Sequence, residues 1–408
     1  MVLKRFVEYF PLVVLLFALS IPSPFLVCIA FFFLILIKSE NTDRSWIAVV
    51  VCSSILIGAI NTVKVPENDL ETYLDLYHLS KDMPLSQYIW VGSTAGGVES
   101  VKEPFYPVVV WILNRLCFDN EQLFKFVFTF INYSLLNTSI LIVGKQNKIE
   151  LKYILFGMFL MTFIPFIFTL SLHAMRQFIA GAFFMIILSL RCFSSIKTWK
   201  IMVISVFMVL LHTTSLLFIP FLFLKAFDKN WKDAKIWYIG LFAGLVMIRV
   251  LSVFLLGFTG MGEDSGLAGY ALSRAAQESG YDVDAIPLIG ILLTIVIVCL
   301  SYYYLYNNSI KDNKGIRRFY NIPFFIGLFV LINLSMKEMA LRFLFYLYFF
   351  VPFVLMFFVH LKKIKSSMLV MMSLAVMLYF LFYLEFGVWT YEIPYTIFFT
   401  PLFAYFFI

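Results

Sequence analysis

FLMTFIPFIFTLSL, the stretch from Phe159 to Leu172, decides the fold class of this chain. It holds no charged residue, and neither does FLFYLYFFVPFVLMFF, which runs from Phe343 to Phe358. In lipid only α-helices and closed β-barrels satisfy every backbone polar group, and a barrel strand alternates apolar and polar residues over about ten positions. Both stretches are almost continuously apolar and longer than one strand, so they predict transmembrane helices.

The composition excludes a water-soluble fold. Hydrophobic residues make up 62% of the 408, Phe alone occurs 49 times, and charged residues account for 13%, against roughly 25% in soluble domains. A soluble chain of this size has too much surface for its volume to bury so much apolar area. We predict an all-α polytopic membrane protein, a single transmembrane domain over residues 1–408 with about 12 to 14 transmembrane segments.

The basic residues indicate which loops face the cytoplasm. Lys and Arg concentrate in cytoplasmic loops, and about 21 of the 31 form clusters that lie on one side if the N-terminus is cytoplasmic. Two longer segments, 63–122 and 259–285, are then periplasmic loops, and Pro104–Phe118 in the first is expected to be a short re-entrant or surface helix. The net charge of +7 follows from this topology, so no nucleic-acid partner is expected.

The segment 200–224 is expected to be a pair of half-helices broken near His212. Basic residues flank it at both ends, and a single crossing would place one basic cluster on the outer side. A break at His212-Thr213-Thr214-Ser215 returns the chain to the side from which it entered. A hydroxyl in this stretch can cap the second half-helix, whose N-terminus would attract anions through its free N–H groups.

Ionisable residues at membrane depth are costly and mark functional sites. Those expected on the outer side come from separate places in the chain, and we expect them to line one polar cavity that opens outward. The candidates are Asp69 and Tyr73 after the third apolar segment, Glu103 and Tyr106 at the short helix, His173, Arg176 and Gln177 between two spans, His212 at the break, Arg274 in the acidic loop, and Lys337, Glu338 and Arg342 late in the chain.

Most of these candidates also have a plain structural explanation. Glu338 and Arg342 are four residues apart and can pair on one helix face. His173 can line a helix interface, and Asp69 and Arg274 can face water. Arg176 is the strongest candidate because apolar residues follow it at once. It stands three residues after His173, so both are expected on one helix face.

Arginines near a helix N-terminus suit a phosphate-bearing ligand, because the guanidinium binds phosphate through two parallel donors. No metal site is expected, since the sequence has no HExxH motif and no His pair at ligand spacing. The five cysteines lie within or at the ends of apolar runs and form no CxxC motif.

The chain resembles the EpsG-type and Wzy-type polymerases of bacterial exopolysaccharide and O-antigen. The resemblance covers roughly residues 60–350 and rests on short patterns in a fixed order. One departure is Lys64, which stands where an Arg is expected before the acidic motif. The patterns are Asp69-x-x-x-Tyr73, Glu103-Pro104-x-Tyr106, Arg176-Gln177-x-Ile179-Ala180, His212-x-x-Ser215-Leu216 and Arg342-Phe343.

The resemblance implies a metal-independent and cofactor-free glycosyltransferase of GT-C-like fold in the bacterial inner membrane, with its active site facing the periplasm. It would transfer a growing glycan from a polyprenyl-diphosphate carrier onto a new lipid-linked repeat unit. Besides these lipid-linked oligosaccharides and the bilayer, a chain-length regulator and a flippase are candidate partners. Arg176, His212, Asp69 and Glu103 would be catalytic, and substrate would be bound by Arg342, Arg274, His173, Gln177, Tyr73, Tyr106, Lys337 and Glu338.

Two other functions fit the same features. A transporter or flippase of lipid-linked oligosaccharide would also need a cationic cavity, but one reached from both sides in alternation. A membrane transferase that adds an acyl or a glucosyl group to such glycans would use similar groups. The clustering of ionisable residues on one side favours the polymerase.

Overall fold

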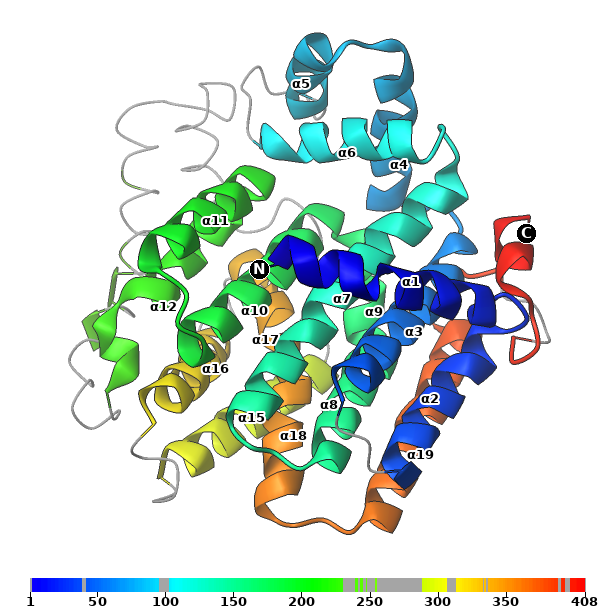
Figure 1. Ribbon diagram of the computed structural model, residues 1–408. Coiled ribbons are helices and arrows are strands. Elements are labelled where there is room, and N and C mark those ends of the chain that lie inside the picture. The colour runs from blue at the N-terminus through cyan, green and yellow to red at the C-terminus, as the bar shows by residue number, and fades with distance from the viewer. Residues whose placement is uncertain are drawn as a thin grey trace. The chain divides into compact units, whose positions relative to one another are not determined.

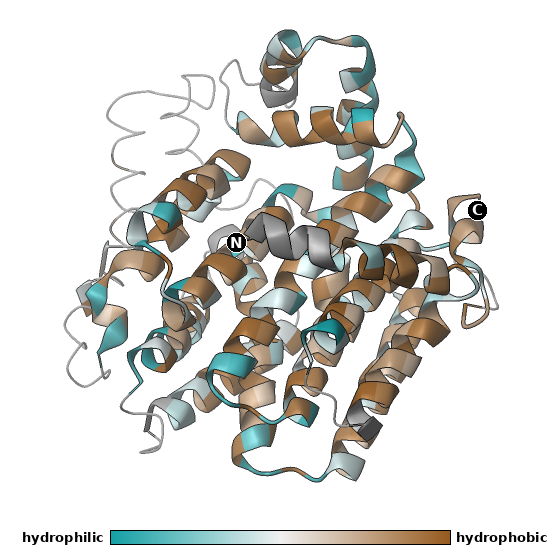
Figure 2. Cartoon of the chain, viewed as in Figure 1, coloured by the Kyte–Doolittle hydropathy of each residue, from teal (hydrophilic) through white to brown (hydrophobic). Residues whose placement is uncertain are grey.

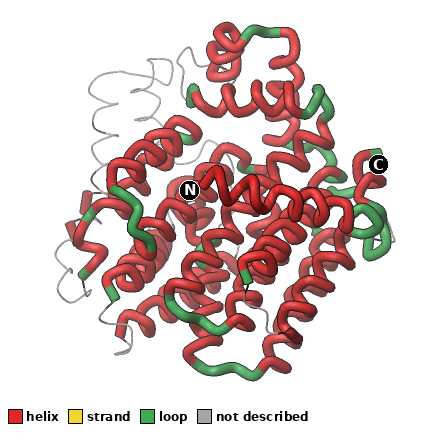
Figure 3. Tube along the Cα trace, in the orientation of Figure 1, coloured by secondary structure: helices red, strands yellow, loops and turns green. Residues whose placement is uncertain are grey.

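The computed structural model of the chain is all-helical (Figure 3), which confirms the predicted fold class. The structure describes residues 2–38, 42–94, 103–229, 288–306, 313–332, 334, 337–387, 390–392 and 397–407, with a few isolated helical positions between 239 and 254. Within these ranges the β-structure is limited to one antiparallel bridge between Lys64 and Tyr391. The loop expected at 259–285 lies outside the described residues.

The chain divides into two compact units, each with its own helical core. Unit 1 comprises residues 1–83, 109–186 and 355–408, and unit 2 comprises residues 84–108 and 187–354. Three of the four boundaries fall within helices, α6 (Phe105–Leu116), α10 (Met175–Phe193) and α18 (Val351–Leu361), and the fourth lies between Met83 and Pro84.

The core of unit 1 is built around α3 (Asp43–Thr62), which packs most extensively on α7 (Glu121–Gln146) and also on the N-terminal helices. Long stretches of the described helices that surround α3 and α7 are strongly apolar (Figures 1 and 2). The remaining unit 1 helices are α1 (Val2–Ser20), α2 (Pro24–Lys38), α4 (Asp69–Leu79), α8 (Leu151–Phe163), α9 (Pro165–His173), α19 (Ser366–Phe386) and two 3-10 turns, Ser80–Asp82 and Leu402–Phe406.

Local signals fix where the two central helices begin. The Thr42 hydroxyl accepts a hydrogen bond from the Ser45 N–H at the start of α3, and the Asn120 side chain accepts one from the Leu123 N–H at the start of α7. Such caps satisfy N–H groups that have no partner inside the helix. Helix α7 also has Glu121 in its first turn and Lys145 in its last, so both charges oppose the helix dipole.

A proline breaks the span formed by α8 and α9. Ile164 precedes Pro165 and is extended, with φ −76° and ψ 116°, because the proline ring disfavours helical backbone in the preceding residue. The two helices meet at a bend of 49°. The sequence that decided the fold class is therefore helical but not straight.

Unit 2 packs α15 (Leu288–Tyr306) and α17 (Lys337–Tyr348) against α16 (Lys314–Ile332). Arg318 of α16 forms an ion pair with Asp228 at 2.6 Å and donates to the carbonyls of Leu222 and Leu224. These bonds hold the end of the broken segment to α16. The other unit 2 helices are α5 (Leu85–Thr94), α11 (Thr198–Leu211), α12 (Ile219–Phe223) and two 3-10 turns, Thr213–Phe218 and Lys225–Asp228.

Several helices are long and apolar enough to cross a membrane, and the chain is a multi-pass membrane protein. Among the described residues five helices qualify, or seven when each of two bent pairs counts as one span. Shorter apolar helices of 10–17 residues are also present among the described residues, including α6, α11 and parts of the first two helices. Helix α6 corresponds to the short helix expected at Pro104–Phe118; on which side of the membrane it lies stays a prediction.

Candidate functional site

The break expected at His212 is present and is organised by Glu103. Helix α11 ends at Leu211, and His212 is extended with φ −155° and ψ 114° before the 3-10 turn begins at Thr213. One carboxylate oxygen of Glu103, Oε1, lies 2.8 Å from His212 Nδ1 and accepts from the Thr213 N–H at 3.0 Å. Glu103 is 6% exposed and His212 is 8% exposed. The carboxylate thus caps the start of the turn and holds the imidazole.

This geometry gives the two nitrogens of His212 different roles. A carboxylate can only accept, so the proton of a neutral His212 lies on Nδ1 and points at Glu103. The second nitrogen, Nε2, then carries the lone pair. A histidine oriented in this way by a buried carboxylate is suited to act as a general base.

Thr214 and Ser215, which follow in the break, are each bound to α17. The Arg342 guanidinium donates to the Thr214 hydroxyl at 3.1 Å, and the Ser215 hydroxyl lies 2.8 Å from the Tyr346 hydroxyl. The Tyr346 ring also stacks on Phe218 with 3.7 Å between centroids. The residues from His212 to Ser215, here named the 212–215 turn, are therefore fixed on both sides, and Arg342 brings a permanent positive charge to them.

A second polar cluster lies in unit 1 and consists of Lys64, Lys125 and His173; we name it the unit 1 basic cluster. The Lys64 Nζ atom lies 2.6 Å from His173 Nε2. The Lys125 ammonium donates to the Lys64 carbonyl at 3.0 Å and pairs with Glu121 at 2.9 Å. Both lysines are almost fully buried, with exposed fractions of 1% and 2%.

The pKa of Lys64 is lowered to about 8, chiefly by burial; nearby Glu67 opposes this shift and Lys125 adds to it. Taking an ammonium group out of water disfavours its charged form. The Lys64 Nζ atom also lies 5.3 Å from the centroid of the Tyr391 ring. The segment that follows α3 therefore carries an amine whose pKa lies near the neutral range.

Arg176 lies in the first turn of α10 and contacts Tyr73 of α4. Its Nε donates to the Tyr73 hydroxyl at 3.4 Å, and the guanidinium carbon lies 5.6 Å from the ring centroid. The shared helix face expected for His173 and Arg176 is wrong. Helix α9 ends at His173, Ala174 is non-helical with φ −120° and ψ 52°, and α10 starts at Met175.

The structure places the other candidates in varied surroundings. Asp69 is exposed in the first turn of α4, whereas Gln177 and Tyr106 are buried at 7% and 3% exposure. Lys337 and Glu338 belong to the first turn of α17, and their side chains lie outside the described part of the chain. Arg274 also falls outside it. The expected single cavity stays a prediction, since the residues that the structure describes belong to two units.

Sequence reasoning missed three buried polar residues of unit 1. Lys64 stands in the sequence only as a departure from a family pattern, and Lys125 is not among the candidates. Asn61 donates to the hydroxyls of Thr129 and Ser171 at 2.9 Å and 2.7 Å, which ties α3 to α7 and α9. A signal for Lys125 was its spacing of four residues from Glu121.

No group of three or more His, Cys, Asp or Glu side chains suited to a metal occurs among the residues that the structure describes. Metal independence stays a prediction. The polar groups found here can instead bind anions and transfer protons.

Comparison with known proteins gives one family. The sequence model of the EpsG family matches residues 45–397, which includes both polar clusters. No curated protein and no solved structure matches the chain.

Proposed function

The chain belongs to the EpsG family, and from this premise we propose that it is a glycosyltransferase that polymerises polysaccharide repeat units carried on polyprenyl diphosphate. The chain is a multi-pass membrane protein, which suits substrates whose carriers are lipids. The outer, periplasmic face of the inner membrane is the proposed side of reaction, because the basic clusters predict the opposite side to be cytoplasmic.

The observation that carries the proposal is the buried Glu103–His212 pair. In the proposed step, His212 Nε2 takes the proton from an acceptor hydroxyl of the new repeat unit. The hydroxyl oxygen bonds to the anomeric carbon of the growing glycan, and the bond from that carbon to the diphosphate breaks. The electron pair leaves with the polyprenyl diphosphate. Glu103 keeps the proton of His212 on Nδ1 and stabilises the imidazolium that forms.

Arg342 and Arg176 are each assigned to a phosphate-bearing ligand on the geometry of its own unit. Arg342 of α17 contacts the 212–215 turn through its hydrogen bond to Thr214. At this place its positive charge would offset the negative charge that develops on the leaving group. Arg176 in unit 1 is held by its hydrogen bond to Tyr73. We assign it to a phosphate-bearing ligand as well. Guanidinium groups suit this role because they bind phosphate oxygens in pairs.

The test is the polysaccharide ladder of a strain that lacks the gene and carries plasmid copies of it. Wild-type protein should restore long chains, and Glu103→Gln and His212→Ala should each leave a single repeat unit at normal protein level in the membrane. Asp75→Asn is the matched control, because Asp75 is an exposed carboxylate on α4 outside both clusters, and it should behave as wild type. Loss of every repeat in the deletion strain would instead indicate a flippase and contradict the proposal.

A further inference from the structure

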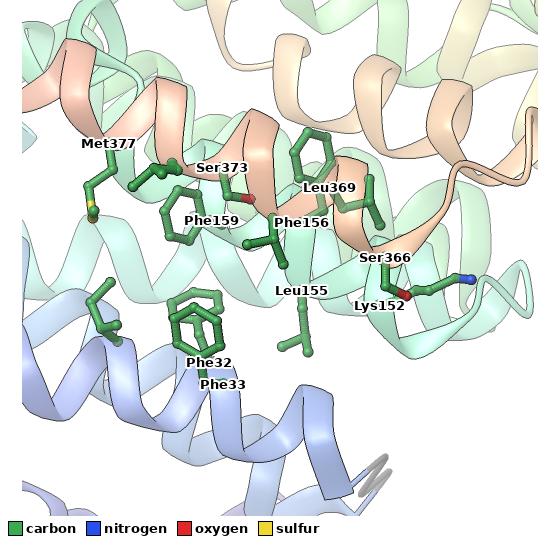
Figure 4. A pocket seen from close by; sticks show the side chains of 13 residues that line it. Phe32, Phe33, Lys152, Leu155, Phe156, Phe159, Ser366, Leu369, Ser373 and Met377 are labelled. Carbon is green, nitrogen blue, oxygen red and sulfur yellow. The ribbon is translucent and has the colours of Figure 1, made fainter.

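An apolar groove runs along unit 1 between α2, α8 and α19. Its volume is about 260 Å³, below the roughly 300–1,000 Å³ of sites that hold drug-sized ligands. Phe32 and Phe33 line one side, and Phe156 and Phe159 line another. Figure 4 shows Lys152 and Ser366 at one end of the groove and Met377 toward the other. Most of the residues that line the groove are apolar.

The length of the groove matches one leaflet of a bilayer. Its lining on α19 extends from Ser366 to Met377, which is about 16 Å at the helical rise of 1.5 Å per residue. One leaflet contributes roughly half of the ~30 Å hydrocarbon core. A lipid of one leaflet can therefore place its headgroup at the Lys152 end and its chain along the groove.

The charge at that end is strongly positive. Lys152 carries the single charge among the described residues that line the groove. The adjoining segments are 145–152, from the end of α7 to the start of α8, and 362–366, from the end of α18 to the start of α19. The Tyr153 hydroxyl of α8 donates to the Ile364 carbonyl of the second segment at 3.2 Å. Around these segments six lysines, at 145, 148, 152, 362, 363 and 365, stand against two acids, Asp43 and Glu150.

Both segments also hold a lysine in a backbone conformation that favours glycine. Lys148 has φ 52° and Lys363 has φ 49°, and each is followed by an isoleucine whose N–H bonds back five residues, Ile149 to Gly144 and Ile364 to Val359. Glycine or asparagine is the usual residue at this point of a helix end. A lysine there costs stability, so its presence twice at one end of the groove points to a use for the charge.

We propose that this groove binds one acyl chain of an anionic glycerophospholipid, whose phosphate lies over the 145–152 and 362–366 segments and contacts Lys152. The apolar walls hold the chain, and the lysines select the headgroup by charge. Glu150 lies 3.3 Å from Lys152 and is 56% exposed, and an exposed pair of this kind is weak. A phosphate can therefore replace Glu150 as the partner of Lys152.

The experiment is native mass spectrometry of the full chain in detergent with added lipid. Dioleoylphosphatidylglycerol should bind at least about fivefold more tightly than dioleoylphosphatidylcholine, since each lysine near an anionic headgroup contributes about that factor. Lys152→Ala should weaken phosphatidylglycerol about fivefold and phosphatidylcholine less, because the choline cation offsets the charge of its phosphate. Lys200→Ala, an exposed lysine of α11 outside the groove, is the matched control and should change neither.

A second pair of variants tests the chain rather than the headgroup. Ser373→Phe fills the groove and should weaken both lipids, whereas Met371→Phe adds a ring at a 71% exposed position of the same helix and should weaken neither. Equal binding of the two lipids, or equal effects of Ser373→Phe and Met371→Phe, would overturn the proposal. Tighter binding of undecaprenyl phosphate than of phosphatidylglycerol would also overturn it, because the occupant would then be an isoprenoid. If glycerol 3-phosphate alone bound with the same affinity, the site would bind only the phosphate, and the proposed binding of an acyl chain in the groove would be refuted.

Discussion

At the scale of single residues, Arg176 is a charged side chain whose position is fixed by contacts within unit 1. It stands in the first turn of α10, and Tyr73 holds it through a hydrogen bond and its ring. If Arg176 stabilises a leaving diphosphate, Arg176→Ala should lower the polymerisation rate by about a few hundredfold. Arg176→Lys should recover little of that loss, because one ammonium cannot reproduce two parallel donors.

A ladder assay beside a membrane blot separates this role from simple helix packing. The blot should show Arg176→Ala at normal level with polymer lost. Normal polymer at normal protein level would refute the role of Arg176. If the alanine variant is poorly retained, Arg176→Lys provides the comparison, since it preserves charge and length.

Lys64 predicts a pH dependence of stability. Its pKa falls from the usual 10.5 to about 8 on folding, so between about pH 8 and pH 10.5 the unfolded chain binds a proton that the folded chain does not. The free energy of unfolding should therefore rise with pH across this window, by roughly 3 kcal/mol at most. Below pH 8 both states are protonated, and this contribution is constant.

The measurement is the thermal unfolding midpoint in detergent between pH 7.5 and pH 10, compared between wild type and Lys64→Met. The variant should lose part of the rise, and the exposed control Lys200→Met should keep it. Identical pH profiles for wild type and Lys64→Met would show that Lys64 is not the group responsible.

At the scale of helices, the packing of α3 on α7 can be tested by a substitution at Gly58. A Cβ atom at Gly58 would lie 3.0 Å from the Phe126 ring and 3.2 Å from the Phe126 carbonyl oxygen. A carbonyl cannot rotate away, so Gly58→Leu should destabilise the protein by about 1–3 kcal/mol and lower its unfolding midpoint. Ile131→Leu, at a 40% exposed position of α7, should not. Equal midpoints for the two variants would contradict this account of the interface.

The sequence predicted the helices and one of their breaks. Apolar run length predicted the all-α fold, and basic residues on both flanks of 200–224 predicted the break at His212, which is present. These features follow from local composition and from the cost of placing charge in lipid. The turn at Ala174 had no such signal, because neither proline nor glycine marks it, and the expected shared face of His173 and Arg176 failed there.

Pairings between distant residues could not be predicted. Glu103 and His212 are 109 positions apart, as are Lys64 and His173, and a single sequence gives no measure of which helices pack together. Both members of the first pair were candidates, whereas Lys64 was not. A lysine at the end of a span is usually solvated at the interface, and only tertiary packing buries this one.

At the scale of the whole molecule, the basic clusters predict which side each loop faces. Reporter fusions after Gly262 and after Lys314 should give periplasmic and cytoplasmic signals respectively. Gly262 belongs to the acidic segment 259–285, and Lys314 belongs to a basic cluster at the start of α16. The reverse pattern would place the 212–215 turn and the unit 1 basic cluster on the wrong side for a periplasmic polymerase.

The central claim is that this membrane protein of the EpsG family joins lipid-linked repeat units without a metal. It is tested most directly by incubating the purified chain with purified polyprenyl-diphosphate-linked repeat units in excess chelator. The account predicts a ladder of glycan lengths and release of polyprenyl diphosphate with wild type, and neither product with His212→Ala. Products that require added magnesium or manganese, or that persist in His212→Ala, would contradict it.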